Sequence, residues 1–370
     1  MITILHILGD ATIGGISSVI LNYYKFIDRN RFSFDIAVSQ GKLGRDAKIL
    51  QSYNSTVYQL PLKSESLSVY TIALEKILRE KHYDIIHVHD NATSYVALAI
   101  AKKMGVKIRF AHAHTSGSRT ISFKKRIRLT FSHLLNGYYA THCVACGEKA
   151  GLHIFGHRIM SRTSSFVLPN SVNTDLFSFN KDLRNKIRSS LGIDDKFVVG
   201  MVGRISQEKN QVRAIALFHY IKKKIPNAIL LIVGDGPEKS IVKDEILKFK
   251  LQDSVKLLGS KDDVQNFYQS FDIFMLPSLY EGFPVAAVEA MASGLPVLLS
   301  DTITSELSFG TAIHYLSLLK AEDWAITACL YLTDDKRSIR QNEVASHGLD
   351  IRHSVTLLEN AYINALNNYV

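Results

Sequence analysis

The sequence predicts an α/β protein with two doubly wound parallel sheets, and three observations support this fold class. The chain has 370 residues, which is more than one ordinary core accommodates and indicates two domains of roughly 150 to 200 residues. Short apolar runs alternate with helical patterns almost throughout, as in parallel sheets covered by helices. The alternation lapses once, over residues 165–182, a polar stretch typical of an inter-domain connection.

The expected elements follow this alternation. Strands of the first half are expected at residues 2–8, 32–38, 55–62, 84–90, 107–114 and 141–147, with helices between most of them, such as 68–82 and 93–104. Strands of the second half are expected at 196–204, 228–236, 254–260, 271–278 and 296–301, with a helix at 210–225. We place the two domains at residues 1–172 and 173–353. Ligands bind beyond the carboxyl ends of strands in such sheets, so the loops there are the candidate sites.

The net charge of +10 lies entirely in the first half of the chain. Residues 102–128 contain nine basic residues and no acidic one. Such a one-sided charge predicts an anionic partner, which is a membrane surface, nucleic acid or a polyanionic substrate. We disfavour nucleic acid because no recognised module or interleaved aromatic pattern accompanies the basic run.

Apolar runs and cysteines predict a cytoplasmic protein. No run approaches the roughly 20 apolar residues that cross a bilayer, and MITILHILGD lacks the features of a signal peptide. Three cysteines fit a reducing compartment. Cys143 and Cys146 form a C-x-x-C inside the apolar run THCVACG, without a second pair, so we expect buried strand thiols and not a zinc or redox site.

The stretch PSLYEGFPVAAVEAMASG, residues 277–294, carries the strongest functional signal. We interpret it as a strand end, a loop and a helix at 284–293, with Pro284 at the first helical position and Gly294 ending it. No Ser, Thr, Asp or Asn caps this helix, so its first amides are expected to be free for a phosphate. Glu281 and Glu289 would repel that phosphate and are expected to accept hydrogen bonds from flanking hydroxyls.

Two further loops of the second half fit a diphosphate. VGRISQEKN, residues 202–210, carries Arg204 and Lys209, which together could neutralise a diphosphate without a metal ion. The chain contains no D-x-D pair for a metal-held sugar nucleotide. VGDGP places Gly234 at a strand end, where backbone can approach a ligand closely. The alternative for the residues 202–210 is a solvated surface loop.

Loops of the first half leave alternatives open. GDATIGGISSVI places Gly14 and Gly15 in a turn that resembles a phosphate cradle, but G-x-G-x-x-G is absent and an NAD site is disfavoured. His112 and His114 share a strand face, as do His87 and His89. A metal site is conceivable for either pair. The alternatives are core or surface histidines, or a role for His114 at the cleft.

On these residues the chain resembles the family 4 retaining glycosyltransferases of the GT-B architecture, most closely those that build bacterial capsular and exopolysaccharides. EGFPVAAVEAMASGLPV matches the paired-glutamate signature of that family, E-x(7)-E, followed in strength by VGRISQEKN and then by IGGI and HAHTSG. The resemblance covers nearly the whole chain. It implies two Rossmann-like domains facing a central cleft, with a final helix at 354–370 that returns to the first domain.

The resemblance also implies roles for individual residues. Glu289 would bind the ribose of the nucleotide, Glu281 would lie by the hydroxyls of the donor sugar, and Arg204 and Lys209 would hold the diphosphate. Gly15 would lie beneath the phosphates, and His114 would reach the transferred sugar. The implied catalytic residues are His114, Arg204, Lys209 and Glu281, and the donor-binding set also includes Gly203, Gly234, Gly282, Phe283, Pro284 and Val285.

The implied reaction is transfer of a hexosyl unit, with retention, from a nucleoside diphosphate sugar to a hydroxyl of a glycan acceptor. We expect UDP as the nucleotide, a lipid-linked oligosaccharide as the acceptor, and neither cofactor nor metal ion. One alternative is a sugar-nucleotide epimerase or hydrolase of the same fold, which would turn over donor without acceptor. Another is a non-catalytic binding subunit, which would be expected to lack Arg204, Lys209 or a glutamate.

Residues 122–139, SFKKRIRLTFSHLLNGYY, form a basic amphipathic pattern. Its start carries Lys124, Lys125, Arg126 and Arg128, and one helical face carries Ile127, Phe131, Leu134, Leu135 and Tyr138. Such a helix can lie on an anionic leaflet, which would make the protein peripheral on the inner face of the cell membrane. The alternative is an ordinary core helix with a charged end.

Overall fold

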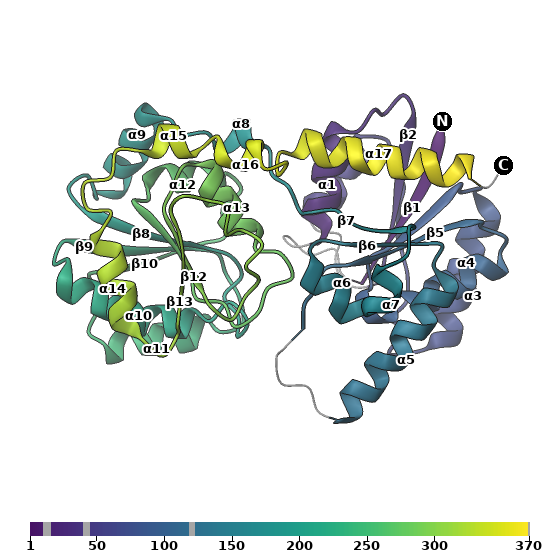
Figure 1. The fold of residues 1–370 in the computed structure, drawn as a ribbon, viewed down its shortest axis with the longest axis horizontal. Helices are drawn as coiled ribbons and strands as arrows, with labels where there is room; N and C mark the ends of the chain where they lie inside the picture. Colours follow the sequence, from purple (N-terminus) through teal and green to yellow (C-terminus); the bar gives the residue numbers. More distant parts are fainter. Residues whose placement is uncertain (10–15, 40–44, 118–122, 369–370) are drawn as a thin grey trace. The chain divides into compact units, whose positions relative to one another are not determined.

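The computed structural model describes residues 1–9, 16–39, 45–117 and 123–368, with backbone alone at 45–47 and 123–126. Two compact units make up the chain: unit 1 is Met1–Asn170 with Ile351–Val370, and unit 2 is Ser171–Asp350. The sequence placed the corresponding domain boundaries at 172/173 and 353/354. Each unit contains one parallel sheet with helices on both faces (Figure 1). No described helix has both the length and the apolar character that a bilayer span requires.

Unit 1 has a seven-stranded sheet in the order β3-β2-β1-β4-β5-β6-β7. Its strands are β1 (Ile2–Leu8), β2 (Phe32–Val38), β3 (Val57–Gln59), β4 (Ile85–Val88), β5 (Ile108–Ala113), β6 (His142–Ala145) and β7 (Ser165–Val167). Its helices are α1 (Ile16–Phe26), α2 (Arg45–Ser52), α3 (Leu67–Glu80), η1 (Asn91–Thr93), α4 (Ser94–Lys103), α5 (Phe123–Tyr139), α6 (Glu148–Phe155), α7 (His157–Met160) and α17 (Ile351–Asn367). The strand β7 lies in the stretch that we expected to be the inter-domain connection. Only three of its residues pair with β6, so it is too short to give a clear strand pattern in the sequence.

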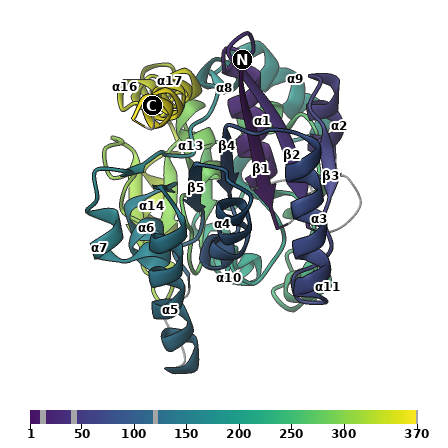
Figure 2. The ribbon, with the colours of Figure 1, turned by 90° about the vertical axis from the view of Figure 1, so that its right-hand side faces the viewer.

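Apolar faces explain how α17 joins unit 1. Its buried side chains, among them Val355, Leu358 and Tyr362, pack in one core with residues of α1 and of strands β1, β2, β4 and β5. The amide of Asp28 donates to the Glu359 carboxylate at 2.8 Å, which fixes the helix along α1. In the view of Figure 2, which faces unit 1, α17 is seen end-on at the edge of the unit, near the C-terminus.

Cys143 and Cys146 are buried free thiols at the end of β6. Burial raises the pKa of the Cys143 thiol to about 12, with a smaller opposing effect of Arg162. A thiol with such a pKa is a poor nucleophile at neutral pH. The prediction of a buried strand thiol is therefore confirmed for Cys143.

Unit 2 has a six-stranded sheet in the order β10-β9-β8-β11-β12-β13. Its strands are β8 (Phe197–Val202), β9 (Ala228–Val233), β10 (Val255–Gly259), β11 (Ile273–Leu276), β12 (Val297–Ser300) and β13 (Ile313–Leu316). Its helices are α8 (Thr174–Phe177), α9 (Lys181–Leu191), α10 (Gln211–Lys224), α11 (Lys239–Lys248), α12 (Val264–Ser270), α13 (Val285–Ala292), α14 (Ala321–Cys329), α15 (Arg337–Arg340) and α16 (Glu343–Ser346). The strand β13 was not predicted from the sequence, because its half-buried residues IHYL lack the long apolar run of a central strand.

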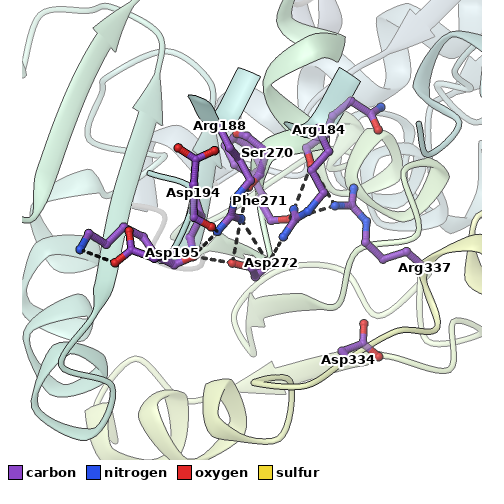
Figure 3. A network of polar contacts seen from close by, with 12 residues as sticks. Arg184, Arg188, Asp194, Asp195, Ser270, Phe271, Asp272, Asp334 and Arg337 are labelled. Carbon is purple, nitrogen blue, oxygen red and sulfur yellow. Dashed lines mark hydrogen bonds and ion pairs between the residues drawn. The ribbon is translucent and has the colours of Figure 1, made fainter. Parts of the chain in front are cut away.

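Two arginines of α9 and one aspartate join the elements at the amino ends of β8 and β11 (Figure 3). Arg184 contacts the Asp272 carboxylate at 2.5 Å and Arg188 contacts it at 3.2 Å. The same carboxylate accepts the amide of Val198 at 2.6 Å. Charge-assisted hydrogen bonds of this kind are about twice as strong as neutral ones. They fix α9 against the two central strands.

Arg337 of α15 is buried and donates to four backbone carbonyl oxygens. The acceptors are Ser293 at 3.1 Å, Gln269 at 3.1 Å, Phe271 at 2.9 Å and Tyr268 at 3.1 Å. Burial lowers the pKa of this guanidinium to about 9. These carbonyls lie at the ends of α12 and α13, so Arg337 holds together the two helices that flank β11.

We predict that Arg337→Met lowers the free energy of unfolding of unit 2 by about 3 kcal/mol, because buried carbonyls lose their donors. Trp324 is the one tryptophan of the chain and is fully buried in unit 2. Urea unfolding followed by its fluorescence therefore reports on this unit. The matched control is Lys336→Met at the neighbouring exposed position, which should leave the midpoint unchanged. Equal midpoints for both variants would contradict the role of Arg337.

Candidate functional site

An ion pair joins the loops that follow β8 and β11, the two central strands of unit 2. Lys209 Nζ lies 2.7 Å from Glu281 Oε1, and Ser278 Oγ donates to the same oxygen at 2.7 Å. The Glu281 side chain is 9% exposed and that of Lys209 is 21% exposed. A carboxylate so far removed from water requires partners of this kind. The structure thus brings together two of the predicted site residues.

Backbone contacts set the spacing of these two loops. The Leu279 amide donates to Glu208 O at 2.8 Å, and Asn210 Nδ2 donates to Pro277 O at 3.0 Å. Asn210 has a φ of 58°, a left-handed conformation that asparagine tolerates better than most residues. The loop carrying Lys209 is therefore fastened directly to the loop carrying Glu281.

The start of α13 differs from the prediction in register. Pro284 is the residue before the helix and not its first residue, and the helix is Val285–Ala292. No side chain caps this end, as expected. The amides of Val285 and Ala287, however, already donate to Phe283 O and Pro284 O at 3.0 and 2.9 Å.

The expectation that all first-turn amides are free was therefore wrong, because the loop turns tightly enough for its own carbonyls to reach them. Gly282 and Phe283 immediately precede this turn. Their amides donate to none of the residues that the structure describes. The backbone donors available to a ligand therefore include those of the loop before α13.

Glu289 lies in the second turn of α13 and is half-buried. Tyr268 of α12 donates its hydroxyl to Glu289 Oε2 at 2.6 Å and is itself fully buried. Burial raises the pKa of the Glu289 carboxyl to about 7, although the Tyr268 hydrogen bond and the charge of Lys209 act in the opposite direction. Tyr268 was missed by sequence analysis, since nothing in the sequence of α12 distinguishes it from a core tyrosine.

Gly203 and Gly234 end β8 and β9 and have φ angles of 146° and 144°. A Cβ at position 234 would lie 1.9 Å from the carbonyl oxygen of Gly203. Both the conformation and the close approach therefore require glycine at 234. The two loops are in backbone contact at this point, so position 234 has no room for a side chain.

Arg204 differs from the other site residues of unit 2. Its side chain is exposed and makes no hydrogen bond or ion pair with any residue that the structure describes. Its carbonyl accepts Gln211 Nε2 at 2.8 Å, so the backbone is fixed while the guanidinium remains available. Gln211 is fully buried and was also missed by sequence analysis.

In unit 1 the predicted residues fall partly outside the described structure. Gly15 lies outside the described residues, and so do the side chains of Lys124, Lys125 and Arg126. His114 follows β5 and its amide donates to Asn91 Oδ1 at 2.7 Å. Its ring contacts His89 and stacks on His112, with ring centroids 4.1 Å apart in the second case.

The basic amphipathic pattern is α5, one end of which projects beyond the other helices of unit 1 (Figure 1). Four of its five predicted apolar residues are exposed: Ile127 56%, Phe131 63%, Leu134 59% and Tyr138 66%. Leu135 is half-buried, and Arg128 is exposed. The alternative of an ordinary core helix is wrong for these four positions, because the helix turns them away from the sheet.

Comparison with known proteins identifies the family. Residues 184–307 match the model described as glycosyl transferases group 1, and residues 13–176 match the model for glycosyltransferase family 4. EpsF of Bacillus subtilis, named as a glycosyltransferase, is 31% identical over 369 residues, which is 97% of this chain and 96% of EpsF. This chain belongs to the family 4 glycosyltransferases.

Two further proteins are similar to this glycosyltransferase. The UDP-Gal:alpha-D-GlcNAc-diphosphoundecaprenol alpha-1,3-galactosyltransferase of Escherichia coli is 27% identical. The aligned region covers 80% of this chain and 79% of the E. coli protein. The crystal structure of HepE from Anabaena in complex with UDP is 19% identical, has a TM-score of 0.81 and covers 98% of this chain and 100% of HepE. The fold is GT-B.

The raised pKa of Glu289 predicts a pH dependence of the stability of unit 2. Between the ordinary pKa of 4.5 and about 7, the folded protein retains a proton that the unfolded chain has released. The free energy of unfolding should therefore fall as the pH rises through this interval. Glu289→Gln should remove that part of the decline in urea midpoints followed by Trp324 fluorescence. Asp253→Asn, at an exposed position, is the control, and an identical profile for Glu289→Gln and the wild type would contradict the assignment.

Proposed function

We propose that this glycosyltransferase moves a hexosyl unit, with retention of the anomeric configuration, from UDP-sugar to a hydroxyl of a lipid-linked glycan. The observation that carries the proposal is the Lys209–Glu281 pair at the carboxyl ends of β8 and β11. It provides a cation for the diphosphate and a carboxylate for the sugar, side by side. Relatives that bind or use UDP compounds support this donor, because HepE has also been solved with UDP-glucose and the E. coli relative is named for UDP-Gal.

The donor would exchange partners with the protein in this site. Its diphosphate takes Lys209, the free guanidinium of Arg204 and the amides of Gly282 and Phe283. Glu281 then shares Lys209 with the diphosphate and accepts hydrogen bonds from sugar hydroxyls. Glu289 accepts a hydrogen bond from a hydroxyl of the ribose. A diphosphate and a hydroxyl-bearing sugar are therefore bound best together, since either alone leaves a charge of the protein poorly paired.

Catalysis would follow from the charge that develops on the leaving diphosphate. As the bond between sugar and phosphate breaks, negative charge grows on the phosphate oxygen, and Lys209, Arg204 and the loop amides stabilise it. The diphosphate itself takes the proton of the acceptor hydroxyl, which attacks on the same face of the sugar. The reaction needs no protein nucleophile and no metal ion at the diphosphate. His114 would contact the transferred sugar.

The acceptor would be held at a membrane by unit 1. A lipid-linked diphosphate acceptor is named for the E. coli relative, and an enzyme acting on such a substrate works at a lipid surface. On α5 the exposed Ile127, Phe131, Leu134 and Tyr138 form a stripe with about one residue per helical turn. With the basic residues at the start of the helix, this stripe has the composition of a helix that lies in an anionic interface.

We predict that Lys209→Ala lowers kcat for transfer by a factor on the order of 100 to 1000, as for the loss of one donor to a developing oxyanion. The measurement is release of UDP together with appearance of the sugar on the acceptor. Isothermal calorimetry with UDP-glucose, UDP-galactose and their GDP counterparts identifies the donor. Lys186→Ala, at an exposed position of the same unit, is the control.

Two results would overturn this proposal. Wild-type transfer by Lys209→Ala would remove the diphosphate assignment. Equal turnover of donor with and without acceptor, yielding free or epimerised sugar, would favour a hydrolase or epimerase.

We predict that α5 binds anionic vesicles. Charge reversal at Lys124, Lys125, Arg126 and Arg128 should release the protein from phosphatidylglycerol liposomes in a sedimentation assay, at about 1 kcal/mol per basic residue near the surface. Phe131→Ser with Leu134→Ser should weaken binding as well, which a purely electrostatic contact would not. The control reverses four exposed lysines of unit 2, namely Lys186, Lys223, Lys243 and Lys248. Unchanged sedimentation of both α5 variants would exclude this surface.

A further inference from the structure

Five histidines form a continuous cluster on one face of the unit 1 sheet. His6 lies in β1, His87 and His89 lie in and just after β4, and His112 and His114 lie in and just after β5. The three strands are neighbours in the order β1-β4-β5, and side chains two residues apart share a face. All five residues except the half-buried His114 are 1% exposed. Neighbouring rings stack with centroids 4.1 to 5.3 Å apart.

The rings bond to one another in two short chains. His6 Nδ1 faces His89 Nε2 at 3.0 Å, and His89 Nδ1 faces His114 Nε2 at 2.8 Å. His112 Nδ1 faces His87 Nε2 at 3.2 Å, and His87 Nδ1 faces the Tyr362 hydroxyl at 2.6 Å. The chains leave three buried nitrogens, His6 Nε2, His112 Nε2 and His114 Nδ1, with no hydrogen-bond partner among the described residues.

Buried polar atoms without a hydrogen-bond partner cost free energy. The cluster therefore destabilises the fold if its only role is to fill the core. An aliphatic or aromatic side chain at these positions would fill the same space without that cost. The sheet instead concentrates imidazoles, which are the commonest metal-ligating side chains. Two sets of three offer one ring nitrogen each, with the three nitrogens within 4.8 Å of one another: His6, His87 and His89, and His89, His112 and His114.

We propose that His89, His112 and His114 bind a divalent transition-metal ion of the zinc class, at a site distinct from the diphosphate loops of unit 2. His114 would ligate through Nε2 and leave Nδ1 for the transferred sugar. Of the two sets, this one has a route for the ion, because His114 lies at the carboxyl end of β5 and is half-buried. The other set is buried in all three members. Three imidazoles leave the fourth tetrahedral position open to water or an anion, as in zinc sites with three histidine ligands.

The geometry needs only small ring movements. Nitrogens bound to one zinc ion at 2.0 to 2.1 Å in tetrahedral geometry lie about 3.4 Å apart. The ring nitrogens of His89 and His114 are now 2.8 Å apart with a proton between them, so the ion takes the place of that shared proton. His89 then ligates through Nδ1 while His6 still bonds its Nε2, which orients the ring as outer-shell partners do for metal-bound histidines.

The charge state of the cluster also suits a metal ion. Burial lowers the pKa of His114 to about 3, and burial with the neighbouring rings lowers the pKa values of His89 and His112 well below 6.5. The rings are neutral at physiological pH, and neutral imidazole is the ligating form. Softer N-ligand sets select Zn²⁺, Co²⁺ or Ni²⁺ over Mg²⁺ and Ca²⁺, which require oxygen ligands.

The test titrates chelator-stripped, full-length protein with Co²⁺ and then with Zn²⁺ against a chromophoric competitor. We expect one equivalent of Co²⁺ to give the ligand-field bands of a tetrahedral site, and Zn²⁺ to displace it. Zinc-edge X-ray absorption of the wild-type protein should count three imidazole nitrogens. This measurement needs no variant, so it decides the proposal even if a substitution in the cluster prevents folding.

His112→Phe should weaken Zn²⁺ binding at least about tenfold, since even outer-shell changes cost that much. His142→Phe is the matched control, because His142 stacks on Phe110 in the same sheet outside both sets. Absence of binding, fewer than three imidazole ligands, or equal affinity in both variants would overturn the proposal and leave the cluster as a hydrogen-bonded row of imidazoles. UDP binding to unit 2 should be the same with and without chelator, so failure of this site and failure of the donor site are distinguishable.

Discussion

The contact between Lys209 and Glu281 joins two loops, and the chemistry that we propose for unit 2 depends on it. Each group alone would be a costly charge in a poorly hydrated place; together, with Ser278, they neutralise one another at 2.7 Å. The ion pair thereby allows a cation and an anion to lie at the ends of the two central strands in a folded pair of loops. A ligand with both a negative and a hydrogen-bond-donating part can take over both, which is the profile of a sugar nucleotide.

Support for this pair extends through the whole of unit 2. Arg337 holds the carbonyl of Tyr268, and the hydroxyl of Tyr268 holds Glu289 at the site. Asp272 fastens α9 to the amino ends of the same strands whose carboxyl ends carry Lys209 and Glu281. Polar groups on the side away from the site thus fix α13, which carries Glu289, and the strands whose loops carry Lys209 and Glu281. Preorganised groups of this kind stabilise developing charge without having to reorient.

Much of this arrangement could be predicted from the sequence, and the parts that could not have physical reasons. Alternation of apolar runs identified the central strands, which are buried on both faces, but missed β13, whose edge position leaves IHYL half-buried. Glu281 and Lys209 were found because charged residues in the loops at strand ends are conspicuous, and Glu289 because it follows a helix start without a capping side chain. Tyr268 was missed because its partner is distant in the sequence, and Gln211 because its partners are backbone atoms. Ser278 was missed although its partner Glu281 is only three residues away. The two H-x-H pairs were noticed, but their union with His6 depends on the strand order β1-β4-β5.

The position of α17 has a consequence for how the chain folds during its synthesis on the ribosome. Residues Ile351–Asn367 belong to unit 1 but are translated after all of unit 2. Until then the face of the first sheet beneath Tyr362, including Phe110 and His87, has no helix to cover it. This part of the first sheet stays exposed while the roughly 180 residues of unit 2 are synthesised, at about 5 to 20 residues per second. Unit 1 can therefore complete its core only after unit 2 has been synthesised, although most of unit 1 is made first.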